Sequence, residues 1–203
     1  MNPPDWLVRK DGLCEQCQLS EDWEWKDKTY RLYRFLTDLE DILAETKNEE
    51  QILSSVRPLV RRLLTSSYWI QGEYTWPDAQ QGWSVLNLYD EMYFPLTIQM
   101  VVWLPGQVSK IHNHGTWGIV ALINGEEKNT FWRRHPQSNT PDRIEKVGEK
   151  NICAGEIISF TSEAIHSIEV IGEEPVVSFN LYGETNYEQR WQFDTFKHTA
   201  KNF

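Results

Sequence analysis

The chain has 203 residues, which suffices for one domain whose core needs no disulfide or metal to be stable. Its 30 acidic and 20 basic residues give a net charge of −10, which excludes a broad phosphate-binding surface, so no nucleic-acid partner is expected. No apolar run of about 18 residues and no apolar signal segment occurs, which predicts a cytoplasmic protein without a membrane partner.

The three cysteines do not form the dense, even-numbered set of a disulfide framework. Cys14 and Cys17 have the C-x-x-C spacing of zinc sites, but no second Cys or His pair follows at the distance of a zinc finger. A weakly packed pair is therefore favoured over structural zinc. Cys153 is expected to be a small buried residue, and residues 1–27 show no period that assigns them a role.

Two amphipathic helices are predicted between residues 28 and 67, because apolar side chains recur there every three or four positions. Asn48 is the expected N-cap of the second helix, with Gln51 as its capping-box partner. Pro58 predicts a kink or a break in that helix. We expect residues 1–67 to form an N-terminal extension and a helical hairpin packed on the main body, although a separate partner-binding helix pair is an alternative.

Residues 68–203 have the pattern of an all-β domain that forms one compact unit with the hairpin. Short segments rich in β-branched and aromatic residues alternate with Gly- and Pro-containing turns, which is typical of a sandwich or a closed barrel. Asn124-Gly125 predicts a hairpin with a type I′ turn. The predicted strands are 83–89, 96–104, 118–123, 127–132, 157–160, 167–171 and 176–182.

Two of the five histidines, His112 and His114, are separated by one residue. On a β-strand such residues point to the same face, so both imidazoles can reach one metal ion. Gly106 precedes His112 by six residues, Gly125 follows His114 by eleven, and Gly118 lies between. This register resembles the first motif of the cupin superfamily, G-x5-H-x-H-x3-E-x6-G, with Gly118 at the glutamate position.

A second block resembles the other cupin motif, G-x5-P-x-G-x2-H. Gly155 and His166 are in register, while Thr161 and Glu163 replace the proline and the glycine. The resemblance covers about residues 83–194. It implies an all-β core, a cupin double-stranded β-helix (jelly-roll barrel) with an N-terminal helical cap. It also implies that a metal inside this barrel is held by His112, His114 and His166.

Three histidines without a carboxylate leave a divalent metal at its full +2 charge and with open positions, which is typical of a catalytic centre. This ligand set resembles that of the thiol dioxygenases, the family of cysteine dioxygenase and 3-mercaptopropionate dioxygenase, which oxidise a thiol to a sulfinic acid with O2. The resemblance implies Fe(II) as cofactor, although Zn, Ni or Cu also suit three imidazoles. Because Gly118 lies where some members carry a cross-linked cysteine, no thioether cofactor is expected.

The family resemblance extends to other candidate residues. Ser178, Asn180 and Tyr182 resemble the family's Ser-x-His-x-Tyr triad, with Asn180 in place of the histidine. This implies catalytic roles for the three residues, with the Tyr182 phenol hydrogen-bonding dioxygen or the substrate sulfur. Unlike imidazole, the Asn180 amide cannot relay a proton by titrating.

Substrate-binding residues are less well matched. Leu86 is at the position of an arginine that grips the substrate carboxylate in cysteine dioxygenase, which argues against cysteine itself. Arg190 resembles the arginine of the mercaptopropionate type and suits a small carboxylate, although a salt bridge to a surface acid is equally open. Trp117 is a candidate for the wall of the cavity mouth.

The sequence thus predicts a mononuclear non-haem iron(II) dioxygenase that oxidises a small thiol, similar to 3-mercaptopropionate or cysteine, to its sulfinic acid. The expected partners are this thiol and O2, and the oligomeric state is not predicted. One alternative is a cupin dioxygenase or hydrolase with a non-thiol substrate. The other is a non-enzymatic protein that binds a metal or a small ligand.

Overall fold

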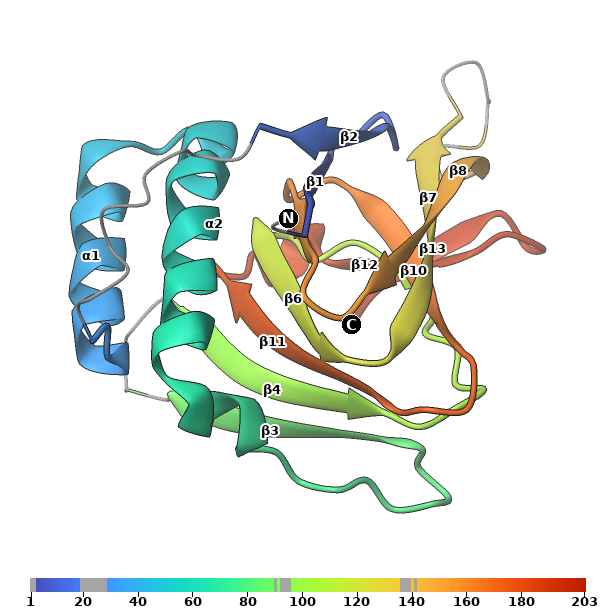
Figure 1. Ribbon diagram of the computed structural model, residues 1–203. Coiled ribbons are helices and arrows are strands. Elements are labelled where there is room, and N and C mark those ends of the chain that lie inside the picture. The colour runs from blue at the N-terminus through green and yellow to red at the C-terminus, as the bar shows by residue number, and fades with distance from the viewer. Residues whose placement is uncertain (1–2, 19–28, 90, 92–95, 136–139, 141) are drawn as a thin grey trace.

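The computed structural model describes residues 3–18, 29–89, 91, 96–135, 140 and 142–203. In this part of the chain two sheets face each other and enclose a barrel, and helices α1 (Leu32–Glu45) and α2 (Glu49–Ser66) cover one side of it (Figure 1). Short 3₁₀ helices follow at η1 (Tyr68–Gly72) and η2 (Tyr187–Gln189).

The strands form two sheets. The larger sheet consists, in spatial order, of β2 (Cys14–Cys17), β1 (Asp5–Val8), β9 (Ile157–Phe160), β6 (Gly118–Asn124), β11 (Val176–Tyr182), β4 (Thr97–Trp103) and β3 (Trp83–Tyr89). The smaller sheet consists of β13 (Thr199–Asn202), β12 (Trp191–Asp194), β5 (Ile111–His112), β10 (Ile165–Ile171), β7 (Glu126–Arg134) and β8 (Ile144–Cys153).

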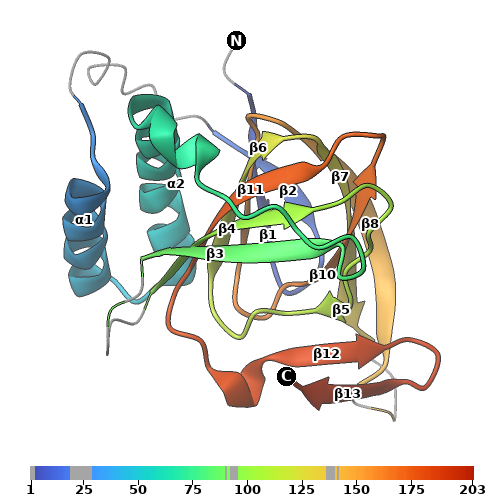
Figure 2. The ribbon, with the colours of Figure 1, turned by 90° about the horizontal axis from the view of Figure 1, so that it is seen from below.

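From β4 onward the chain crosses between the sheets almost every time one strand ends and the next begins (Figure 2). This crossing pattern winds the chain into a double-stranded β-helix, so the predicted jelly-roll barrel with an N-terminal helical cap is confirmed. The predicted strands 83–89, 157–160 and 176–182 coincide with β3, β9 and β11.

The Asn124-Gly125 pair is a corner between the sheets, and the predicted hairpin is wrong. Strand β6 pairs with β9 and β11, whereas β7 pairs with β8 and β10. Gly125 has φ +80°, but Asn124 does not share the positive φ that a type I′ turn requires. A Cβ at Gly125 would lie 2.5 Å from the carbonyl oxygen of Pro175, so the corner needs glycine because the two backbones approach closely.

Alternating residues of β11 separate two environments. Phe179 and Leu181 are fully buried among helix residues, and the Phe179 ring contacts Phe35 of α1 edge-on with centroids 6.4 Å apart. Ser178, Asn180 and Tyr182 point the other way and line the barrel interior. This period of two places an apolar core under the helices and polar side chains inside the barrel.

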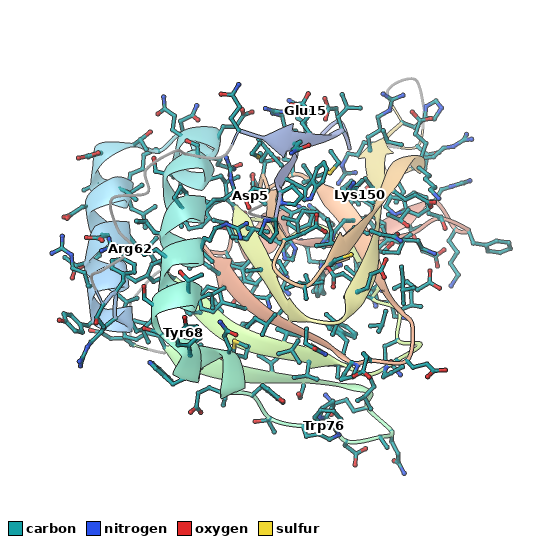
Figure 3. The ribbon with its side chains drawn as sticks, viewed as in Figure 1. Asp5, Glu15, Arg62, Tyr68, Trp76 and Lys150 are labelled. Atoms are coloured by element: carbon teal, nitrogen blue, oxygen red, sulfur yellow. The ribbon has the colours of Figure 1, made fainter. Side chains whose placement is uncertain are left out.

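Helix α2 runs through Pro58 without a break, so of the predicted kink or break the break is wrong, and the kink stays a prediction. Val56, Leu59 and Val60 are buried on both sides of the proline, and their packing on the barrel outweighs the one hydrogen bond that proline cannot donate. Arg61 of α2 forms an ion pair with Asp5 of β1, which lies on the side of the barrel that faces α2 (Figure 3).

The N-cap of α2 is as predicted, but its capping box is indirect. Asn48 Oδ1 accepts a hydrogen bond from the Gln51 backbone amide at 3.0 Å. The Gln51 side chain does not reach the Asn48 amide but accepts from the Thr46 hydroxyl at 2.7 Å, and this hydroxyl accepts from the Asn48 amide at 3.1 Å. The Thr46 hydroxyl therefore links the Gln51 side chain to the Asn48 amide, in place of the direct hydrogen bond of a capping box.

Replacing Asn48 with alanine is expected to lower the free energy of unfolding by about 1 kcal/mol, because one amide of the first turn loses its acceptor. Urea unfolding followed by circular dichroism measures this change. The Asn48→Asp variant should retain most of the stability because a carboxylate caps equally well. A loss below about 0.3 kcal/mol for alanine would contradict a stabilising cap.

The cysteine pair lies on β2, where positions i and i+3 point to opposite sides. Cys14 packs against the cluster around Val8, whereas Cys17 packs against the core under the helices. The two thiols therefore do not converge, and burial raises the pKa of Cys14 to about 11. Cys153 is exposed, which corrects the expectation that it is buried. No helix in the described residues is both long enough and apolar enough to cross a membrane.

Candidate metal centre

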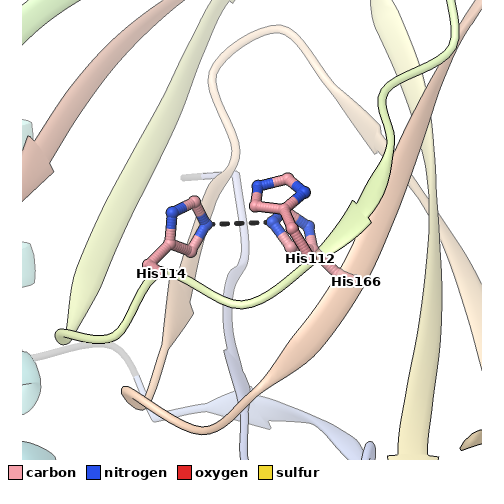
Figure 4. Close-up of side chains that lie close together, drawn as sticks. All are labelled: His112, His114 and His166. Atoms are coloured by element: carbon pink, nitrogen blue, oxygen red, sulfur yellow. Dashed lines mark hydrogen bonds between the residues drawn. The ribbon is translucent and has the colours of Figure 1, made fainter. Parts of the chain in front are cut away.

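Three histidines converge inside the barrel (Figure 4). His112 ends β5, His114 follows two residues later beyond the strand, and His166 lies opposite His112 on the paired strand β10. One ring nitrogen from each residue lies within 4.8 Å of the others. The Nε2 atoms of His114 and His166 are 3.0 Å apart, and among the described residues this is the only such group.

Hydrogen bonds orient two of the rings from behind. His112 Nδ1 lies 2.8 Å from the Lys110 carbonyl oxygen, so Nδ1 carries the proton and donates it. His166 Nδ1 lies 3.0 Å from Asn129 Oδ1. In both residues Nε2 consequently carries the lone pair and is directed into the barrel, which is the arrangement that metal-binding imidazoles use. In the structure Nε2 of His166 accepts a hydrogen bond from Nε2 of His114.

The three imidazoles have the protonation state that metal binding requires. Burial lowers the pKa of His112 to about 4 and, aided by neighbouring imidazoles, lowers the pKa of His114 and of His166 well below the usual range. At metal–nitrogen distances of about 2.0–2.1 Å, two ligands at a right angle would be about 2.9 Å apart, which suits the His114–His166 spacing. The site can therefore hold a divalent metal.

Tyr182 occupies the space that Gly118 leaves open. A Cβ at Gly118 would lie 2.6 Å from Cδ1 of Tyr182, whose ring stacks on His114 with centroids 4.7 Å apart. The Tyr182 hydroxyl donates to Asn180 Oδ1 at 3.1 Å, and Asn180 Nδ2 donates to the Ser178 hydroxyl at 2.8 Å. Burial raises the pKa of Tyr182, so this phenol is a neutral donor. The structure thus brings the three triad-like residues and the histidines to the same cavity.

The cavity has a volume of about 750 Å³ and contains charged groups of both signs. Arg190 lines it, and its guanidinium lies 4.3 Å above the centre of the Phe203 ring. Within the described residues Arg190 forms no salt bridge, and its buried Nε has no hydrogen-bond partner. The alternative that Arg190 pairs with a surface acid is therefore not what the structure has.

Leu86 and Trp117 lie outside the cavity, which corrects their placement as substrate-binding residues. Leu86 is opposite Met100 and packs toward the helices, while its neighbours Val85 and Asn87 line the cavity. The buried Trp117 belongs to the same core under the helices. Successive residues of a strand face opposite sides of the sheet. An error of one residue in the sequence comparison therefore moves a predicted side chain from the cavity to the core.

The buried carboxyl group of Glu127 was not predicted from the sequence. Glu127 of β7 lines the cavity and its Oε1 accepts a hydrogen bond from Asn129 Nδ2 at 2.8 Å, so that a Glu127–Asn129–His166 chain forms. Burial raises the pKa of Glu127 from its usual 4.5 to about 7. The inward alternation of Glu127, Asn129 and Phe131 was the available signal, because a glutamate on the buried face of a strand is unusual.

We expect Glu127→Gln to stabilise the metal-free protein in a pH-dependent manner. The raised pKa means that folding favours the protonated carboxyl, so stability falls as pH rises from about 4.5 to about 7. At roughly 1.4 kcal/mol per pKa unit this loss is about 3 kcal/mol, and Gln avoids it. Urea unfolding should show equal stability of both proteins at pH 4 and a more stable variant at pH 8. An equal difference at both pH values would contradict this assignment.

No protein-family model matches the sequence. Among solved structures, the chain is similar to a cupin superfamily protein from Desulfitobacterium hafniense DCB-2, with 11% identity over 56% of this chain and 86% of that chain and a TM-score of 0.41. It is similar to an oxalate oxidase in complex with glycolate, with 15% identity, 57% of each chain covered and a TM-score of 0.44. It is also similar to KdgF from Halomonas sp., with 14% identity over 58% of this chain and 94% of that chain and a TM-score of 0.42.

These likenesses, at TM-scores below 0.5, bear on neither the site nor the activity. The strand order itself defines the class: the protein is a jelly-roll barrel, a double-stranded β-helix. Its interior carries a three-histidine group that can hold a metal ion.

Proposed function

We propose that this protein is a mononuclear non-haem iron(II) dioxygenase that oxidises a small carboxylate-bearing thiol to its sulfinic acid. The supporting observation is the combination of three neutral imidazoles, a glycine at the position of a fourth ligand, and an arginine in the same cavity that has no carboxylate partner among the described residues. In the reaction, R–SH + O2 → R–SO2H, both oxygen atoms enter the product and no further reductant is needed.

Iron(II) held by His112, His114 and His166 would supply open positions at which the thiolate and dioxygen react. Arg190 would bind the carboxylate, because its guanidinium presents donors in a planar fork and no protein carboxylate competes for it in the described residues. The Tyr182 hydroxyl, now bonded to Asn180, would donate to the sulfur or oxygen atoms of the reactants.

The direct test is anaerobic loading with Fe(II), followed by exposure to O2 in the presence of 3-mercaptopropionate, cysteine or cysteamine. We expect oxygen uptake and a stoichiometric sulfinate with at least one carboxylate-bearing thiol. No oxygen uptake and no sulfinate from any of them would overturn the proposal.

For Arg190→Ala we predict a KM for 3-mercaptopropionate that is roughly 10- to 100-fold higher, since one charged hydrogen-bond partner contributes about 1.5–3 kcal/mol. The KM for cysteamine, which has no carboxylate, should change little. Arg133→Ala is the matched control because Arg133 is exposed and paired with Glu145 at 2.7 Å. Equal losses for both thiols would show that Arg190 does not bind the carboxylate.

The Glu127 carboxyl group supports a second candidate, a metal-dependent enzyme that acts on a non-thiol substrate such as a β-diketone. A buried carboxyl with a pKa of about 7 has the property of a general base at neutral pH. Consumption of such a substrate by the metal-loaded protein, abolished by Glu127→Gln and without thiol oxidation, would favour this function.

A further inference from the structure

Asn113 lies between two of the candidate metal ligands but points away from them. Its side chain is buried and makes hydrogen bonds to distant parts of the chain. Asn113 Nδ2 donates to the Gln189 carbonyl oxygen at 2.8 Å, and Oδ1 accepts from the Trp191 amide at 2.7 Å. The Asn113 amide also donates to the Trp191 carbonyl oxygen at 3.1 Å. Asn113 thus holds the backbone immediately before and after Arg190.

Gly115 contacts the backbone of the same segment, at Asn186 and Arg190. It has φ +65°, and a Cβ there would lie 2.6 Å from the Asn186 carbonyl oxygen and 3.0 Å from the Arg190 amide nitrogen. The Asn186 amide donates to the Gly115 carbonyl oxygen at 3.0 Å. The backbone of Arg190 therefore packs directly on Gly115, in a conformation that only glycine adopts without strain.

The third ligand is connected to the same residue. Asn113 Nδ2 also donates to the Ser162 carbonyl oxygen at 2.9 Å, in the turn that precedes β10 and His166. In the segment His112-Asn113-His114-Gly115, histidines that face the cavity alternate with residues that anchor the Arg190 segment. The ligand group and the Arg190 backbone consequently form one hydrogen-bonded unit.

We propose that Asn113 is a positioning residue that fixes the distance between the three histidines and Arg190, and thereby selects the chain length of the bound thiol carboxylate. This inference rests on the proposed function. A thiol that binds the metal and carries a carboxylate is held at two points, so its length must match their separation. Misplacement by about 1 Å can cost about 100-fold in rate, so a loose Arg190 segment loses this selection.

The experiment compares mercaptoacetate, 3-mercaptopropionate and 4-mercaptobutyrate, with ethanethiol as the probe that lacks a carboxylate. Anaerobic binding to the Co(II)-loaded protein is followed by the absorption of the metal, so that no turnover is needed. The wild-type protein should bind one carboxylate thiol at least about tenfold more tightly than the other two. In Asn113→Ala the three should differ by less than about threefold, with ethanethiol affinity and metal content unchanged.

Further variants separate positioning from general loss of structure. Asn113→Asp retains the acceptor for the Trp191 amide and loses the donors, so an intermediate selectivity is expected. Gly115→Ala displaces the Arg190 segment without changing the Asn113 side chain and should weaken selectivity even if Asn113→Ala fails to fold. Asn151→Ala is the control, because the exposed Asn151 side chain bonds Glu126 on the outside of the barrel and its loss should leave selectivity intact.

Hydrogen exchange in the metal-free protein supplies a second readout, since the amide of Trp191 should lose protection in Asn113→Ala. Equal affinity of the wild-type protein for the three carboxylate thiols would overturn the inference, as would full selectivity in Asn113→Ala. A third outcome separates the two proposals. Length-selective binding that depends on Asn113, together with no sulfinate when the Fe(II)-loaded protein is exposed to O2, would support the inference while refuting the proposed oxidation.

Discussion

Replacing His166 with alanine is expected to abolish stoichiometric binding of divalent metal. His166 supplies one of three converging nitrogens, and its Nε2 lies 3.0 Å from that of His114. Two imidazoles remain in the variant, and no other ligand atom of the described residues belongs to this group. Elemental analysis after loading with Fe(II) and desalting should give about one iron per wild-type chain and almost none in the variant.

Thermal unfolding gives an independent measure of the same change. Metal that binds the folded state alone raises the Tm of the wild-type protein, and this rise should vanish in His166→Ala. The free energy of unfolding of the metal-free variant should fall by only about 1–3 kcal/mol, because Asn129 Oδ1 remains buried without its donor. His135→Ala is the control, since His135 lies 3.7 Å from Glu145 and outside the cavity. Full metal content in His166→Ala would remove the proposed site.

The second large effect is expected for Gly118→Ala. The new Cβ would lie 2.6 Å from Cδ1 and 2.8 Å from Cε1 of Tyr182. The ring cannot move freely, because it stacks on His114 and its hydroxyl is bonded to Asn180. Overpacking of this kind costs about 1–3 kcal/mol, measured by urea unfolding of the metal-free protein.

Two comparisons make this prediction specific. Gly148→Ala on β8 should change stability by less than about 0.5 kcal/mol, because no heavy atom lies within 4 Å of its Cβ position. In a cycle with Tyr182→Ala, which vacates the space, the two losses should not be additive. Additive losses would show that Gly118 and Tyr182 do not compete. If they do compete, a glutamate ligand at position 118 and the Tyr182 ring exclude each other.

The strands that were predicted with correct bounds have a simple physical signal. Residues 83–89, 157–160 and 176–182 are rich in β-branched and aromatic side chains and are bounded by turn residues. Strands β8, β12 and β13 were missed because their apolar residues are interrupted by charged and polar ones, as the exposed alternate positions of β8 illustrate. Strands β1 and β2 lie in residues 1–27, where the apolar residues show no periodicity. They form because β1 pairs with β9, more than 140 residues away along the chain.

The sequence by itself predicted the three histidines and the jelly-roll barrel through its resemblance to the two cupin motifs, because glycine and histidine spacings are local properties. The strand pattern alone left a sandwich or a closed barrel open. The tertiary structure alone decided which side of each strand faces the cavity. It places Glu127 in the cavity lining, whereas Leu86 and Trp117 pack in the core under the helices. It also decided that Asn113 holds the Arg190 segment, a contact between residues 76 positions apart. The physical reason is that a one-residue change of register reverses the direction of every side chain, and only the packed sheets determine the register.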